Sequence, residues 1–141
     1  MLCGVVALGC AFPAMQAKAQ SSPTLDSLHT EAAVDRVASA FKNGDADPLF
    51  GVTAERIDLN LLGSRSYYSR SQASYVLRDF FRHHRPTDFV IERSAEADAS
   101  LFVMGVFHHD RADRPAQVMV RFEQGAESWV LHELRIEADH P

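Results

Sequence analysis

Cysteine is nearly absent from this chain of 141 residues. The chain has two cysteines, Cys3 and Cys10, and both lie within its first ten residues. The rest of the chain therefore offers no thiol as a nucleophile, as a thiolate metal ligand or as half of a disulfide. A domain built from it must be stabilised by its hydrophobic core alone, which is feasible for a chain of about 120 residues.

Long apolar runs and an excess of positive charge are missing as well. No apolar run reaches the roughly 18 residues that a membrane-spanning helix needs. The chain has 14 basic and 19 acidic residues, which gives a formal net charge of −5 and argues against nucleic-acid binding through phosphate contacts. Hydrophobic residues make up 46% and charged residues 23%, a composition typical of one globular domain.

Several motifs that would identify a catalytic or metal site are absent too. There is no G-x-S-x-G nucleophile elbow, no phosphate-binding glycine loop and no dinucleotide fingerprint. The densest group of possible metal ligands is His108-His109-Asp110. Neighbouring residues of a strand point to opposite faces, so these two imidazoles cannot bind one ion without a bulge. We expect no metal and no cofactor.

The first twenty residues resemble an export signal. An almost wholly apolar run from Val5 to Met15 is followed by Ala17-Lys18-Ala19, the small-residue pattern of a signal peptidase site. We predict that residues 1–19 are a secretory signal peptide and that residues 22–138 form a single domain. The mature protein would then be exported to the periplasm or out of the cell.

Two other interpretations of the same segment stay open. Leu8-Gly9-Cys10 is compatible with a lipobox, which would make the protein a lipoprotein anchored through Cys10; the apolar run continues past Cys10, which favours the secretory signal. A buried N-terminal helix is the other interpretation, and it is disfavoured by Gly4, Gly9 and Pro13 within a dozen residues.

The remaining sequence predicts an α+β domain. Apolar stripes at helical spacing and strand-like alternation follow one another along the chain. We expect a first helix at 26–42, ended by Asn43-Gly44, a second at 48–53 with Asp47 as its N-cap, and a third from a Ser69–Gln72 capping box to Pro86. Strands are expected at 57–61, 66–68, 88–94, 100–109, 117–123 and 128–137. Helices that cannot bury their apolar stripes alone must pack on one face of a curved, mostly antiparallel sheet.

The last predicted strand changes its apolar parity midway. Trp129 and Leu131 share one parity, whereas Leu134 and Ile136 share the other. A β-bulge near His132-Glu133 would return all four side chains to one buried face, and bulges are how a sheet bends around a helix.

This order of elements resembles the nuclear transport factor 2-like superfamily, whose fold is cone-shaped (cystatin-like). Within it, the stretches AFKNGDADPLF, YYSRSQASYVLRDFF and LHELRIE are similar to a bacterial secreted family known as domain of unknown function 4783. The superfamily includes ketosteroid isomerases, polyketide cyclases, dehydratases and many proteins without catalysis. The resemblance implies that a homodimer through the sheet face is possible, but the narrower family implies no activity.

The resemblance also bears on catalysis. The isomerases carry an Asp base at the end of the first long strand, before a Gly turn, and that motif places Asn60 at the base position. An amide cannot accept a proton as a general base, which argues against isomerase chemistry through this position. Asp58 lies on the same predicted strand face as Asn60.

A cone of this kind has a concave space between its sheet and its helices, and a few polar residues are predicted to reach it. These candidates are Asp58, Asn60, Tyr67 or Tyr68, His108, His132, Glu133 and Arg135. With a regular hairpin at 111–115, His108 should pair near Val118 and share a face with Met104 and Val106. Beside a carboxylate it would form an acid–base pair. Arg135 would either bind a carboxylate or phosphate inside the cone or form half of a cross-strand ion pair.

Three functions remain compatible with the sequence. The first is a non-catalytic exported protein that binds a small apolar or anionic ligand in its cone, or another protein through its sheet. The second is a cofactor-free dehydratase, cyclase or isomerase that uses His108 with Asp58 or a Tyr. The third is a purely structural or partner-binding module, which predicts a cone filled by its own aromatic rings and an exposed apolar sheet face.

Overall fold

The structure is a computed structural model, and it describes residues 24–139 together with Gly4 and Gly9. The lipidation site considered above, Cys10, and the rest of the expected signal segment except Gly4 and Gly9 lie outside the described residues. The elements run in the order α1 Leu25–Asn43, α2 Asp47–Phe50, β1 Thr53–Leu61, β2 Ser64–Ser69, α3 Arg70–His83, β3 Pro86–Ala97, β4 Ser100–His109, β5 Ala116–Gln124 and β6 Trp129–Ala138. None of the helices in this described part is long and apolar enough to cross a membrane.

Side-chain and glycine caps set the ends of the two long helices. The predicted capping box opens α3, with the Ser69 hydroxyl accepting from the Gln72 N–H and the Gln72 side chain accepting from the Ser69 N–H. Helix α1 ends where predicted, at Gly44, which has φ +64° and so adopts the left-handed conformation that glycine favours.

The short second helix differs from its prediction. Helix α2 ends at Phe50 and not at Thr53: Gly51 is its C-cap, and the chain becomes extended from Thr53, the first residue of β1. Asp47 is the first residue of this helix and not its N-cap; its backbone N–H is instead held by the Asp45 carboxylate at 3.0 Å. The β-branched residues that follow Gly51 favour the strand.

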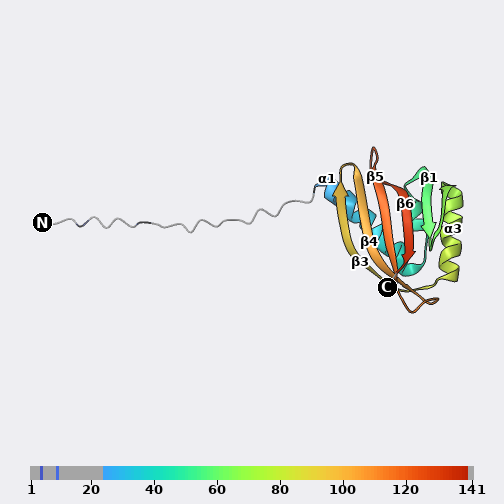
Figure 1. The fold of residues 1–141 in the computed structure, drawn as a ribbon. Coiled ribbons are helices and arrows are strands. Elements are labelled where there is room, and N and C mark those ends of the chain that lie inside the picture. Colours follow the sequence, from blue (N-terminus) through green and yellow to red (C-terminus); the bar gives the residue numbers. More distant parts are fainter. Residues whose placement is uncertain (1–3, 5–8, 10–23, 140–141) are drawn as a thin grey trace.

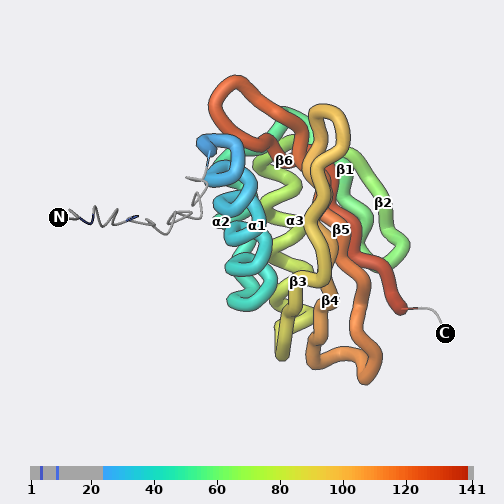
Figure 2. The backbone as a smooth tube through the Cα atoms, turned by 90° about the vertical axis from the view of Figure 1, so that its left-hand side faces the viewer, coloured from blue at the N-terminus to red at the C-terminus, as the bar shows by residue number. Residues whose placement is uncertain are grey.

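The six strands form one sheet in the order β2-β1-β6-β5-β4-β3. All neighbouring pairs are antiparallel except β1 and β6, which are parallel. All three helices lie on one side of the sheet, and its other side carries no helix (Figure 2). We call the uncovered side the outer face. The predicted fold class, helices on a curved and mostly antiparallel sheet, is confirmed.

The predicted bulge in β6 is present. Phe122 of β5 is paired with Leu131, but its neighbour Arg121 is paired with Glu133, so His132 is the extra residue. Leu131 and Leu134 are consequently both fully buried against the helices. The parity change along β6 is thus resolved as the sequence predicts.

The core between helices and sheet is dominated by phenylalanine rings. Phe41 of α1 stacks on Phe89 of β3, with centroids 4.9 Å apart, and meets the edges of Phe81 and Phe107 at 5.4 and 5.5 Å. Phe80 extends the cluster, 6.0 Å from Phe81. Each such ring contributes about 1.5–3 kcal/mol of burial free energy, and aromatic pairs add to that.

One glycine is required by this packing. Gly105 of β4 lies beneath the Phe89 ring, and a Cβ atom added there would lie 2.6 Å from Phe89 Cζ and 2.8 Å from the Val90 carbonyl oxygen. No side chain can occupy that space unless the backbone or the ring moves. The absence of a Cβ at Gly105 therefore lets β3 and its ring lie directly on β4.

We predict that Gly105→Ala lowers the free energy of unfolding by about 1–3 kcal/mol, since overpacking a close-packed core costs that much. Gly51→Ala is the matched control, because Gly51 has φ −66° and nothing lies within 4 Å of its added Cβ. Equilibrium urea unfolding of both variants measures the difference. Equal stabilities for the two variants would contradict the packing described for Gly105.

Candidate functional site

The concave space that we expected to hold a ligand is occupied by the core. Phe41, Phe81, Phe89 and Phe107 interlock there, and all four are at most 3% exposed. This is the filled cone that the partner-binding hypothesis predicts. A ligand or substrate would have to displace these rings to enter.

Most of the predicted site residues lie on the outer face and not in the concave space. Ile57 and Leu59 of β1 are buried against the helices, so the intervening Asp58 and the following Asn60 point outward, because side chains alternate along a strand. Asn60 uses its side-chain oxygen to accept from the Gly63 N–H at 3.2 Å, which closes the β1–β2 turn.

The same alternation places Glu133, Arg135 and His108 outside. Leu134 and Ile136 are fully buried, so Glu133 and Arg135 flank them on the outer face. His108 shares its face with Met104 and Val106 as predicted, but this is the outer face. Its strand neighbour is Asp88 of β3, and not Val118 as the hairpin prediction implied.

The expected acid–base pair of His108 with Asp58 is not assembled. Asp58 pairs with Glu133, Glu133 with Arg121 and Arg121 with Phe102, so three strand spacings separate Asp58 from β4. His108 then lies six residues further along that strand. The two side chains are therefore about 14 Å apart across the sheet and about 20 Å apart along it.

Ion pairs join several charged residues of the outer face, and we call these ion pairs together the ion-pair network. Arg65 of β2 binds both carboxylate oxygens of Asp58, the shorter contact being 2.6 Å. Glu133 receives Arg121 at 3.1 Å and Arg135 at 2.9 Å. Arg135 thus forms an ion pair, as one hypothesis expected, but its partner Glu133 lies on the same strand. The cross-strand partner of Glu133 is Arg121.

Glu123 completes the network. It pairs with Arg121, and its second oxygen lies 3.3 Å from Nε2 of His132. Asp58 is only 7% exposed and Glu133 only 9% exposed, so these carboxylates need their partners. The formal charges of the three arginines and three carboxylates cancel.

Both central guanidiniums are held in the charged form. The hydrogen bonds and charge of Asp58 raise the pKa of Arg65. Burial acts to lower the pKa of Arg121, but its hydrogen bonds and charge interactions with Glu133 and Glu123 outweigh burial, and the net shift is upward. The network is therefore a permanent, internally balanced feature of the outer face.

Next to the network lies an apolar cluster, also on the outer face. Phe102, Met104 and Val106 of β4 are half-buried, and Met119 of β5 is paired with Met104. Val90 of β3, the neighbour of Val106, is 50% exposed. We call these five residues the outer apolar cluster. Because Phe102 pairs with Arg121, the cluster directly borders the ion-pair network.

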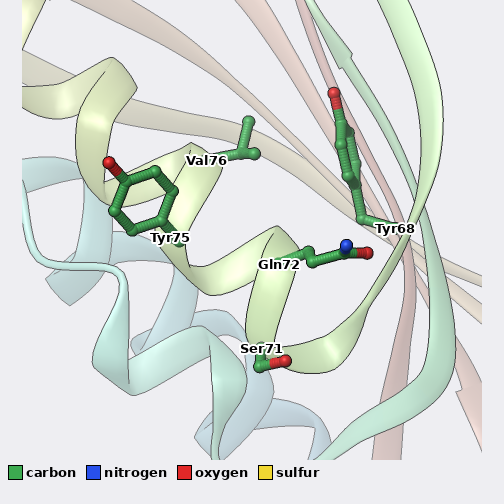
Figure 3. A pocket seen from close by; sticks show the side chains of 5 residues that line it. All are labelled: Tyr68, Ser71, Gln72, Tyr75 and Val76. Carbon is green, nitrogen blue, oxygen red and sulfur yellow. The ribbon is translucent and has the colours of Figure 1, made fainter.

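A first hollow lies between the edge strand β2 and helix α3. Tyr68 is on the strand side and Gln72, Tyr75 and Val76 are on the helix side, around a volume of about 360 Å³ (Figure 3). Tyr68 is thus turned toward α3, unlike Tyr67, which is 60% exposed. The lining is mainly apolar, and it contains no carboxylate, histidine or basic residue for acid–base work.

A second hollow contains two histidines. His84, at the end of α3, and His109, at the end of β4, lie with ring centroids 5.1 Å apart and planes at 78°. The hollow has a volume of about 520 Å³, and the hairpin between β4 and β5 forms much of its wall. His109 is 7% exposed. Burial lowers its pKa, the nearby His84 lowers it further, and Asp110 opposes the shift.

Sequence reasoning missed this histidine pair. It singled out His108. His83 and His84 cap the end of α3, since each imidazole Nδ1 bonds a backbone carbonyl four residues earlier. The available signal was the alternation along β4, since a buried Phe107 implies an inward His109. Among the described residues, no group of three or more His, Cys, Asp or Glu is placed to hold a metal ion.

Comparisons with known proteins identify a family. A family model described as domain of unknown function 4783 matches residues 34–137. No curated protein matches the chain. Among solved structures, the chain is similar to a DUF4783 family protein from Bacteroides uniformis ATCC 8492, with a TM-score of 0.69 and 23% sequence identity over 76% of this chain and 97% of that one.

Two further solved structures place the fold more broadly. One is a nuclear transport factor 2-like protein of unknown function from Burkholderia xenovorans LB400, with a TM-score of 0.58 and 16% identity over 84% of this chain and 88% of that one. The other is a LEH-like epoxide hydrolase of M. tuberculosis, with a TM-score of 0.57 and 16% identity over 79% of this chain and 84% of that one. These likenesses show a shared fold and nothing about activity.

We predict that His109 makes the stability of the protein sensitive to pH. Its pKa is lowered in the folded state, so the unfolded chain binds the proton more readily and stability is lost as the pH falls below about 6.5. One such group changes the free energy of unfolding by at most about 1.4 kcal/mol per pH unit.

Urea unfolding between about pH 7.5 and about pH 5.5 measures this dependence in the wild type, His109→Gln and the control His108→Gln. The slope of stability against pH should be shallower in His109→Gln than in the wild type. It should be unchanged in His108→Gln, whose side chain lies on the opposite face of the same strand. Identical slopes in all three proteins would disprove the assignment to His109.

Proposed function

The chain belongs to the family called domain of unknown function 4783, and because this name carries no activity we propose a function from the geometry. We propose that the protein is an exported, non-catalytic binding module, and that its binding surface is the outer face of the sheet. The observation that carries the proposal is an uncovered sheet face bearing the outer apolar cluster, on a domain whose cone is filled.

Two features favour binding over turnover. The cone interior, which would shield a substrate from water, is filled by the phenylalanine cluster. The residues expected to act as acid and base, His108 and Asp58, are separated by several strands. General acid–base catalysis requires the acid and the base within hydrogen-bonding reach of one substrate. His108 and Asp58 are too far apart to meet this requirement.

The occupant that fits this face is a second copy of the same chain. The ion-pair network has no net formal charge, so it does not select a strongly acidic or basic partner. The outer apolar cluster is exposed beside it and needs an apolar counterpart. A two-fold axis through the cluster would bring apolar residues against apolar residues, as self-complementary dimer interfaces do.

Export is supported by composition. The apolar run and Ala17-Lys18-Ala19 fit a signal peptide, and the chain beyond residue 10 has no cysteine. The proposed mature protein therefore has no thiol to oxidise and no disulfide to form in an oxidising compartment.

Analytical ultracentrifugation over a range of concentrations tests the association. We expect the wild type to sediment as a dimer, and Met104→Glu to raise the dimer dissociation constant by about 30-fold or more, because a buried unpaired charge costs at least about 2 kcal/mol. Tyr75→Glu is the control, since Tyr75 is 63% exposed on α3, away from the outer face.

The result against the proposal is equally clear. A wild-type protein that remains monomeric at every concentration, or a Met104→Glu variant that associates as tightly as Tyr75→Glu, would remove the outer face as a self-association surface. Far-UV circular dichroism of both variants shows whether the substitutions leave the fold intact.

A further inference from the structure

The hollow that contains His84 and His109 lies apart from the outer face. It is formed where the C-terminal end of α3, the hairpin between β4 and β5 and the chain after β6 come together, near the C-terminus (Figure 1). Its volume of about 520 Å³ is within the range of small-molecule sites, about 300–1,000 Å³. No function described above uses it.

The aromatic core continues into this hollow as imidazole rings. His84 stacks on Phe80 with centroids 4.3 Å apart and planes at 15°, and His109 stacks on Phe107 at 5.4 Å and 25°. The two imidazoles are thus held in place by the packed phenylalanines beneath them. Such fixed polar groups at the base of a hollow lose little entropy when they bind a ligand.

Each imidazole has one nitrogen bound to the backbone and one left over. His84 Nδ1 lies 3.1 Å from the Phe80 carbonyl oxygen and therefore donates to it. His109 Nδ1 accepts from the Arg111 N–H at 3.3 Å, which leaves the proton of the neutral ring on Nε2. Neither Nε2 has a hydrogen-bond partner within the described chain.

The charged groups around the imidazoles are balanced. Arg111 and Arg114 of the hairpin line the hollow together with Asp113 and with Asp139, which follows β6. Arg111 is held across the hollow by donating from Nε to the His83 carbonyl oxygen at 3.0 Å. Two guanidiniums and two carboxylates cancel formally, so the charge of the hollow depends on the protonation of the two imidazoles.

The nearest other charged groups are already occupied. Asp110 accepts from the Arg85 N–H at 3.0 Å and donates its own N–H to the Arg85 carbonyl. The remaining lining is apolar and comes from Leu62, Ala112, Pro115, Ala116 and Ala138. An apolar wall with a few convergent polar groups is typical of a site for an organic molecule.

We propose that this hollow is a binding site for a small organic carboxylate with an apolar or aromatic body, which binds together with a proton. The carboxylate oxygens accept from Nε2 of His109 and from Nε2 of His84 once that ring is protonated. The guanidiniums of Arg111 and Arg114 add donors of fixed geometry. The apolar body lies against the alanines and proline of the wall.

Proton uptake follows from the tautomer of His84. Its Nδ1 donates to the Phe80 carbonyl oxygen, so its Nε2 must gain a proton before it can donate to a carboxylate, whereas a proton added to His109 would have to go to Nδ1, which already accepts from the Arg111 N–H. A bound carboxylate favours the protonated ring of His84, so ligand binding and proton binding strengthen each other. Affinity therefore rises as the pH falls, by up to about tenfold per pH unit for one linked proton.

Benzoate is the probe, followed by NMR of the histidine rings in the purified protein at about pH 7.5 and about pH 5.5. The expected result is a saturable shift of the His84 and His109 resonances, tighter at the lower pH, with no shift at His108. The absence of a saturable shift, an equal shift at His108 or an affinity independent of pH would each overturn the proposal. Inorganic phosphate that binds where benzoate does not would overturn the assignment to carboxylates.

Variants give a second test. His84→Gln should abolish the pH dependence of benzoate binding and His109→Gln should weaken that binding by about tenfold or more, whereas His108→Gln should bind as the wild type does. Arg114→Gln, a substitution of an exposed residue outside the core, serves if His109→Gln does not fold, and it should also weaken binding. Wild-type affinity in both His109→Gln and Arg114→Gln would exclude the site.

Discussion

The stacking of Phe41 on Phe89, at 4.9 Å, is the contact on which the rest of this structure depends. It joins α1 to the edge strand β3, and Phe81 and Phe107 meet Phe41 edge-on from α3 and β4. These rings meet where a cone of this fold would be hollow. The same contacts therefore fill the cone and hold the helices on the sheet. Interiors are close-packed and deform little, so these rings leave no space for a ligand between them.

The alternation of side chains along the strands then places the apolar core on one face of the sheet and the ion pairs on the other. With one face committed to the phenylalanine cluster, every second residue of β1, β4, β5 and β6 must lie on the outer face, and the bulge at His132 preserves this division to the end of β6. The partly buried carboxylates of Asp58 and Glu133 can be tolerated there only with guanidinium partners. Such networks contribute little net stability, which makes an association surface a better explanation of them than folding does.

Local features were predictable from the sequence, and pairings between distant segments were not. The capping box at Ser69, the glycine end of α1, the bulge at His132 and the helix-on-sheet class all follow from short-range chemistry, and all are confirmed. The parallel pairing of β1 with β6 joins Asp58 to Glu133, which follows it 75 residues later (133 − 58), and it has no local signal. The direction of Asp58 was available in the alternation of Ile57 and Leu59, but it was outweighed by the expectation of an open cone.

The histidine pair shows how the same core determines what its boundary can do. At the centre of the cluster each phenylalanine ring is surrounded by other apolar side chains. At its end the rings of His84 and His109 border a hollow. An imidazole suits that position, because its plane continues the stack on Phe80 or Phe107 while its nitrogens face outward. Once backbone groups of Phe80 and Arg111 occupy one nitrogen of each ring, the remaining nitrogens are fixed in direction. A rigid apolar core thus orients two titratable groups at the end of the phenylalanine cluster, where a hollow opens beside them.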